Sequence, residues 1–147
     1  MMTLEQARAV VTAVLARGRE QGASPLTVAV LDAGGHLVAL EREDGSGILR
    51  PDIAIAKAYG ALGMGLSSRE IGRRAEKQPV FFTTLASIAQ GRLAPAAGGV
   101  LVRSDDGAVI AAVGVSGDVS DVDEVSAIAG VLAAGLRPDP ETPPDLG

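Results

Sequence analysis

Residues 26–44, LTVAVLDAGGHLVALERED, decide the fold of this chain, because they read as two strands folded back on each other. Apolar side chains recur on both sides of the sequence Asp32-Ala33-Gly34-Gly35. Glycine takes a positive φ without a Cβ penalty, and an aspartate side chain can bond the backbone of a turn. The pattern therefore predicts an antiparallel hairpin, with His36, the only histidine, at the start of its second strand.

Helices are predicted on either side of this hairpin. The sequence from Thr3 to Gln6 has the capping-box pattern, and the helix that it starts can end at Gly22. After the hairpin, Pro51 suits the first turn of a second helix, because its missing N–H costs nothing there. We expect that second helix to end near Gly63.

The second half of the chain predicts more helices and a second hairpin. Another capping box begins at Ser67, and we expect a helix from there to about Lys77. Residues 80–97 leave helix, strand and loop open, since a helix over 80–90 would include the strand-like sequence FFTT. Strands are expected over residues 100–103 and 108–116; the second is apolar on both faces, which is typical of a covered central strand.

A last helix over residues 120–135 completes the order helix, two strands, two or three helices, two strands, helix. This order predicts an α+β fold, in which helices pack on an antiparallel sheet, and excludes a doubly wound parallel sheet. We expect one domain over residues 1–136. The tail over residues 137–147 is rich in proline and is expected to be mobile, without regular structure.

Composition excludes several classes of protein. A net charge of −5 argues against a nucleic-acid surface, which needs clustered positive charge. The absence of cysteine excludes disulfides, thiolate metal sites and a cysteine nucleophile. No apolar run has the length of a membrane span, and the N-terminus lacks the pattern of a secretion signal, so we expect a cytoplasmic protein without membrane contact.

Two side chains are the main candidates for chemistry. His36 is either a haem ligand, a general acid or base, or a solvated polar residue at a strand end. Lys57, among alanines, either pairs with an anionic ligand, pairs with Asp32 or Asp44 of the hairpin, or extends its ammonium into solvent. Arg42 follows the second strand and could line the same site.

Charged residues elsewhere are interpreted as ordinary helix features. Arg69, Arg73 and Lys77 are spaced four residues apart, and their stripe is interpreted as a solvated face, although it could hold carboxylates or phosphates. The acidic residues near the start of the last helix are explained best by capping and the helix dipole. They are Asp118, Asp121, Asp123 and Glu124.

Several short motifs, in this order and spacing, resemble the GlcG/HbpS family of haem-degrading-domain-like proteins, which includes the C-terminal domain of PduO. They are DAGGHLV with RED after it, Lys57-Ala58, Gly98-Gly99-Val100, and GVSG before an acidic helix. The resemblance spans about residues 3–135. It implies a profilin- or PAS-like sheet of five antiparallel strands flanked by helices, assembly into homo-oligomers, and haem or corrinoid binding in some members.

The resemblance also implies roles for individual residues. His36 matches the histidine that ligates haem in PduO-like members, while Lys57, Gly98, Gly99 and Ser116 match positions that line the expected pocket. The first hypothesis is therefore a protein that binds haem or another tetrapyrrole, for degradation or sensing. In it, His36 is on the iron, and Arg42 or Lys57 is near a propionate.

Two other hypotheses stay open, so the sequence does not decide whether the protein is an enzyme. In the second, a cofactor-free enzyme acts on a small organic acid or carbonyl compound. Lys57 or His36 then transfers a proton, and the amides of Gly98 and Gly99 stabilise an anion. In the third, the chain is a non-catalytic accessory module of an oligomer.

Overall fold

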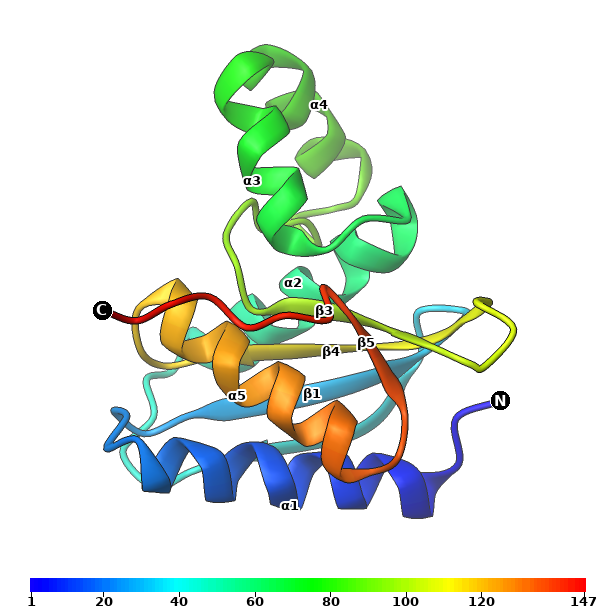
Figure 1. Ribbon diagram of the computed structural model, residues 1–147. Coiled ribbons are helices and arrows are strands. Elements are labelled where there is room, and N and C mark those ends of the chain that lie inside the picture. Colours follow the sequence, from blue (N-terminus) through cyan, green and yellow to red (C-terminus); the bar gives the residue numbers. More distant parts are fainter.

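The computed structural model describes all 147 residues, and it contains five helices and five strands. Figure 1 shows them as one open sheet with helices on both faces. In chain order they are α1 (Leu4–Glu20), β1 (Thr27–Asp32), β2 (Leu37–Arg42), α2 (Arg50–Met64), α3 (Ser68–Lys77), α4 (Pro79–Ile88), β3 (Gly99–Arg103), β4 (Val109–Ser116), α5 (Ser120–Ala133) and β5 (Arg137–Asp139).

The sheet confirms the predicted α+β class. Its strand order is β2-β1-β4-β3-β5, and every neighbouring pair is antiparallel. The two predicted hairpins therefore join through β1 and β4, with Thr27 opposite Ser116 and Asp32 opposite Ala111. Strand β4 is central, as its apolar run predicts, because a strand covered on both faces has no polar side to present to water.

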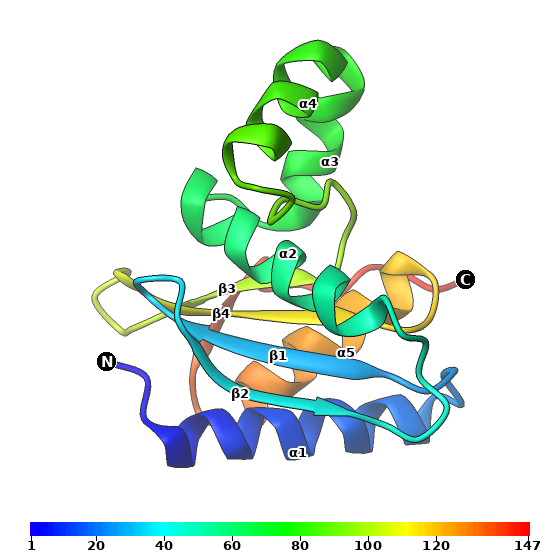
Figure 2. The same ribbon diagram turned by 180° about the vertical axis from the view of Figure 1, so that it is seen from behind.

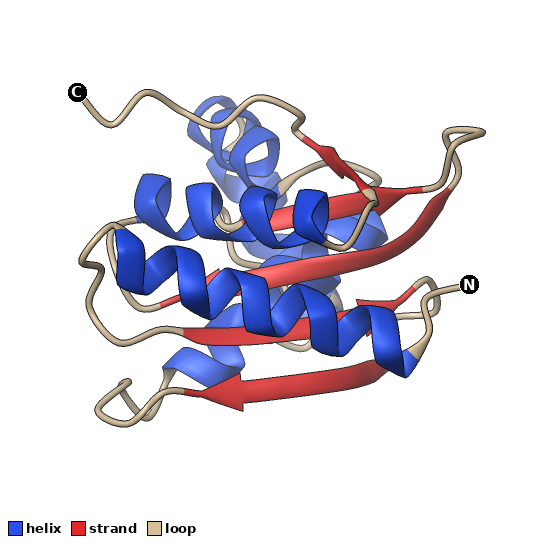
Figure 3. Cartoon of the chain, turned by 60° about the horizontal axis from the view of Figure 1, so that its bottom comes forward, coloured by secondary structure: helices blue, strands red, loops and turns tan.

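Three helices cover the two faces of the sheet. Helices α1 and α5 lie side by side across one face, as Figure 3 shows, and α2 lies on the other face, in view in Figure 2. The larger core lies under α1 and α5, where Val28, Val30, Val113 and Val115 point. Alternate residues of the same strands, such as Leu31, point toward α2.

Helices α3 and α4 form a hairpin that stands away from the sheet (Figure 1). Of residues 80–97, which the sequence left open, those up to Ile88 belong to helix α4 and the rest form neither helix nor strand. Pro79 occupies the first turn of α4, and the hydroxyl groups of Thr83 and Thr84 donate to carbonyls one turn earlier, which satisfies these polar groups locally. Phe82 packs on Ile71 in a small core of its own.

The expectation of a tail without regular structure is wrong for residues 137–139. They form β5, which pairs with β3 and places Arg137 opposite Arg103. Arg103 also donates to the carboxylate of Asp139, at 2.9 and 3.0 Å. An edge strand of the sheet offers unpaired backbone groups, and Pro138 is tolerated in such a strand because it lies at the edge. Mobility of the remaining tail stays a prediction.

Candidate functional site

Lys57 lies in a buried ion pair between α2 and the start of α5. Its Nζ donates to Asp123 Oδ2 at 3.1 Å and to the carbonyl of Val115 at 2.9 Å. The exposed fractions of the two side chains are only 4% and 1%. Burial lowers the pKa of Lys57 below its usual 10.5, although Asp123 opposes the shift, and burial raises the pKa of Asp123 above 3.8.

The sequence-based partners of Lys57 were therefore wrong. The ammonium reaches neither Asp32 nor Asp44, and it is not solvated. The carboxylate comes instead from Asp123, which was interpreted as a residue that complements the helix dipole. Its Oδ1 also accepts from the amide of Asp118 at 2.9 Å, so both of its oxygens are bonded. The pair fixes α2 against α5 across the end of β4.

The paired glycines lie directly against Lys57. Gly98 has φ +126, and a Cβ there would meet the Val115 carbonyl at 2.7 Å and Lys57 Nζ at 2.8 Å. The amide of Gly99 donates to Ser68 Oγ at 2.6 Å, and both groups are buried. Because this amide already has a partner, the predicted role of Gly99 in stabilising an anion is wrong for this structure. The two glycines instead allow close approach of α2.

Two other predicted site residues have partners within the chain. Ser116 is fully buried, and its hydroxyl accepts from Arg50 at 3.1 Å. Arg42 donates to the carbonyl of Ser46 at 2.7 Å. Arg42 also lines a charged groove of about 470 Å³ together with Arg19. This groove lies at the end of the sheet where β2 finishes.

Arg69 and Glu124 correct two interpretations, that of Arg69 as part of a solvated face and that of Glu124 as a capping residue that complements the helix dipole. Arg69 Nε donates to Glu124 Oε1 at 2.9 Å, and its Nη2 contacts Asp121. Glu124 is buried, with an exposed side-chain fraction of 1%, and this burial raises its pKa above the usual 4.5, although Arg69 opposes the shift. Sequence periodicity gave no sign of this, because the two residues are 55 positions apart.

His36 lies at the turn of the first hairpin, whereas Ser116 and the Lys57 pair lie at the other end of β1, which begins at Thr27. The side chain of His36 is 80% exposed. Its Nδ1 is 3.2 Å from Asp32 Oδ1. The same oxygen accepts from the amides of Gly34 and His36, and these hydrogen bonds, first that of His36, hold the pKa of Asp32 below its usual range. An ionised carboxylate can only accept, so Nδ1 is the donor in this contact, and in the neutral ring Nε2 is then the nitrogen that can coordinate a metal.

An apolar groove begins beside this turn and was missed by sequence reasoning. A Cβ on Gly35 would lie 2.8 Å from the ring of Tyr59, so the turn and α2 are in close contact. Tyr59, Leu85 and Ile88 are among the residues that line a groove of about 240 Å³ between α2 and α4. Arg92 lies over the Tyr59 ring, with Cζ 3.9 Å from its centroid, a cation–π contact.

The candidate residues thus fall into separate places. Lys57, Gly98, Gly99 and Ser116 meet at one end of β4. His36 precedes β2, whereas Arg42 ends it. At about 3.3 Å per residue, the strand separates these two by roughly 20 Å. The sequence-based picture of one haem on one chain, with His36 on iron and Arg42 or Lys57 at a propionate, is therefore corrected. Arg92 is the cation near the His36 turn.

Fold and site define a small α+β domain, with a five-stranded antiparallel sheet, an exposed imidazole at its first turn and a buried ion pair beneath α2. The chain belongs to the HbpS-like family, described as haem degrading protein HbpS-like, because the model of that family matches residues 2–132. This confirms the family predicted from the sequence. No curated protein matches the sequence.

Solved structures resemble the chain over most of its length. A double mutant of HbpS from Streptomyces reticuli is 32% identical, with a TM-score of 0.77, covering 88% of this chain and 84% of that one. Protein ORFY from Klebsiella pneumoniae is 27% identical, with a TM-score of 0.82, covering 91% and 90%. A complex of PduOC with haem has a TM-score of 0.83, covering 92% and 96%, and at 21% identity it shows the fold alone.

None of the helices has both the length and the apolar character needed to cross a lipid bilayer.

Proposed function

We propose that this protein binds haem, with His36 as the axial ligand of the iron. The observation that carries the proposal is the exposed imidazole held by a carboxylate through one ring nitrogen. Asp32 accepts from Nδ1 at 3.2 Å, and the exposed ring leaves Nε2 to coordinate a metal. Histidine ligands of metals usually donate their other ring N–H to a carboxylate or carbonyl, which orients the ring and raises its basicity.

The surface beside His36 suits the rest of a porphyrin. Tyr59, Leu85 and Ile88 offer apolar area, and 73% of Ile88 is exposed. Arg92 adds a guanidinium, a group that pairs well with the carboxylate of a propionate. The groove of about 240 Å³ is smaller than the sites that enclose whole cofactors, so haem would lie across this surface rather than inside it.

We also propose that the protein is a homo-oligomer. Helix α4 contains no charged residue, yet it exposes 80% of Val80 and 52% of Phe81. A second copy packed on α4 would remove this apolar area from water and shield haem on the adjoining groove. The molar mass in solution, measured by light scattering, tests this; a chain that stays monomeric at micromolar concentration contradicts it.

Bound haem supplies a redox-active iron, and the residues above would hold and orient it. The family description contains haem degradation, and haem sensing is the second role proposed from the sequence. They are separated by incubating the loaded protein with a reductant and oxygen. Loss of the Soret band with release of iron supports degradation, while intact haem supports sensing.

The second hypothesis, a cofactor-free enzyme around Lys57, receives less support. Lys57 is buried and paired, and the amide of Gly99 is bonded to Ser68. The third hypothesis, a module without ligand, is an outcome of the haem titration below.

A haemin titration followed by absorbance tests the proposal. We expect a saturable Soret shift, lost in His36→Gly and restored when free imidazole is added to that variant. Arg92→Met should weaken the affinity severalfold, while Arg74→Met, an exposed arginine on α3, should leave it unchanged. No saturable shift in the wild-type protein refutes haem binding. An unchanged spectrum in His36→Gly refutes the ligand.

A further inference from the structure

A second cavity lies far from the His36 turn. It is enclosed by the start of α3, the first turn of α5 and the C-terminal segment, and its volume is about 440 Å³. This volume falls in the range of small-molecule sites. Besides Ser67 and Thr142, its polar lining consists of two arginines, Arg69 and Arg73, and three carboxylates, Glu70, Glu124 and Asp139. The carboxylate of Asp139 is held by Arg103.

Glu124 gives this cavity a polar atom without a partner. Its Oε1 accepts from Arg69, but its Oε2 is buried and makes no hydrogen bond. Buried carboxylate oxygens are almost always bonded, because an unpaired one forfeits its hydration without compensation. Glu124 lines the cavity, so a hydrogen-bond donor that reached Oε2 from there would be stabilised.

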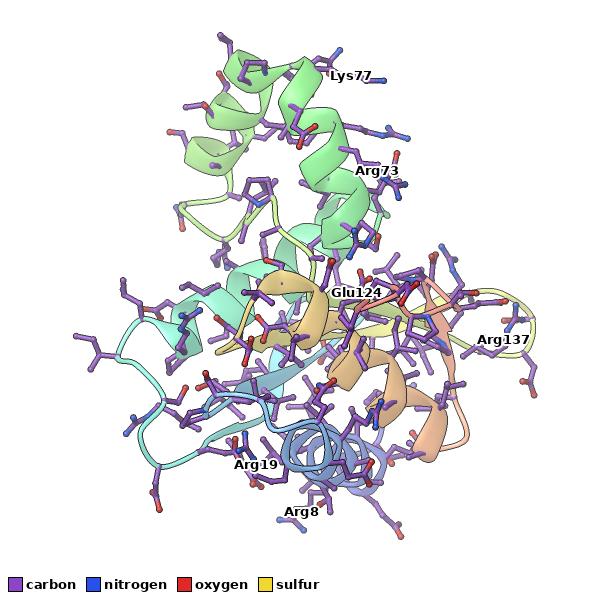
Figure 4. All side chains as sticks on the ribbon, turned by 60° about the vertical axis from the view of Figure 1, so that its left-hand side comes forward. Arg8, Arg19, Arg73, Lys77, Glu124 and Arg137 are labelled. Atoms are coloured by element: carbon purple, nitrogen blue, oxygen red, sulfur yellow. The ribbon has the colours of Figure 1, made fainter.

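Two guanidinium groups face the same cavity from α3. Arg69 uses Nε and Nη2 on Glu124 and Asp121, so Nη1 remains for another acceptor. Arg73 is 68% exposed and is held by Glu70 at 3.0 Å. Figure 4 shows Arg73 on α3 on the same side of the molecule as Glu124 at the start of α5. Such a pair of arginines is suited to a carboxylate.

We infer that this cavity binds a small carboxylic acid that carries a hydroxyl or ammonium group next to its carboxylate. The carboxylate pairs with Arg69 and Arg73, and the neighbouring donor bonds Oε2 of Glu124. One ligand thus satisfies the unpaired oxygen and the free guanidinium edges together. This site is independent of haem binding at His36, because different elements build the two.

Three probes with the same carbon skeleton separate these contributions. L-alanine, L-lactate and propionate differ only at C2, which bears an ammonium, a hydroxyl or a hydrogen. Titration calorimetry should show saturable binding of alanine or lactate, and propionate should bind at least tenfold more weakly. The order of alanine and lactate tells whether the site takes amino acids or hydroxy acids.

Matched variants test the residues. Arg73→Met should weaken binding at least tenfold, whereas Arg74→Met, which pairs with the same Glu70 but does not line the cavity, should change it less than twofold. Glu124→Gln keeps an acceptor for Arg69 but presents an N–H donor to the ligand, so alanine, whose ammonium can only donate, should lose its advantage over propionate.

The inference is overturned if none of the three acids binds saturably up to tens of millimolar. It is also overturned if Arg73→Met binds like Arg74→Met, a result that does not depend on the folding of Glu124→Gln. The haemin titration of Arg73→Met should match the wild type, so failure of this site and failure of haem binding are distinguishable.

Discussion

Replacing Lys57 by methionine is the most direct test of the buried ion pair beneath α2. Methionine has a similar length and no charge, so it fills the space but leaves the carboxylate of Asp123 without its counter-ion. That carboxylate is 1% exposed, and only the amide of Asp118 would remain as a partner. Removing one member of a buried pair costs about 3–5 kcal/mol, because the other charge stays desolvated.

The double variant Lys57→Met/Asp123→Asn distinguishes this cause from a packing defect. The asparagine oxygen can still accept from Asp118, and no buried charge remains. Neutral replacements of a whole buried pair are often close to neutral in stability. The double variant should therefore be more stable than Lys57→Met alone, with a coupling energy of about 1–3 kcal/mol.

Urea unfolding at pH 7, followed by circular dichroism, measures these free energies. A loss of about 3–5 kcal/mol in a chain of this size corresponds to roughly 6–20 °C in Tm. Burial raises the pKa of Asp123 above 3.8, so the native state takes up this proton at a higher pH than the unfolded state. Lys57 lowers this pKa, so its removal raises the pKa of Asp123 further, and the penalty of Lys57→Met should be full well above 3.8 and should vanish as pH falls below 3.8.

Two results would refute this reasoning. One is a loss below about 1 kcal/mol in Lys57→Met at pH 7, which would mean that the pair is solvated or weak. The other is a double variant as unstable as the single one.

Three further predictions concern packing and pH. Gly114→Ala in β4 should lower the free energy of unfolding in urea by about 1–3 kcal/mol or more, because a Cβ there meets the backbone of α2. Gly63→Ala, at an exposed position of α2 with open space around it, should raise that free energy by about 0.5–1 kcal/mol; equal effects of the two substitutions would contradict the packing. Ser68→Ala should cost about 1–3 kcal/mol and speed amide exchange at Gly99, which loses its buried acceptor; unchanged exchange would show that another group replaces it. Burial raises the pKa of Glu124 above 4.5, so the wild type loses stability as pH rises from 4.5 through the raised pKa. Glu124→Gln does not titrate and should gain stability relative to the wild type over this pH range. A difference in unfolding free energy that stays constant with pH would contradict the raised pKa.

Local patterns predicted much of the fold. The capping box at Thr3 is present with both of its hydrogen bonds, and α1 follows it. Asp32 at the end of β1 and the glycines after it form the predicted turn, with φ +82 at Gly35. The two-sided apolar run of β4 predicted its central place. These features were readable because each depends on residues within a few positions of one another.

Long-range contacts escaped the same reasoning. Strand β5 forms because β3 has a free edge, which nothing in the tail itself indicates. The acidic residues of α5 suited a helix start so well that their burial was not foreseen. Arg92, over the ring of Tyr59, belongs to a segment whose conformation the sequence left open.

By itself, the sequence determined the class of fold, the order of its elements apart from α4 and β5, the family and the position of His36 at the first turn. Only the tertiary structure decided which charges meet. Lys57 pairs with Asp123, 66 positions away, and Glu124 lines a cavity with one oxygen unpaired. The physical reason is that secondary structure depends on backbone preferences of neighbouring residues, whereas burial of a charge depends on every element packed around it.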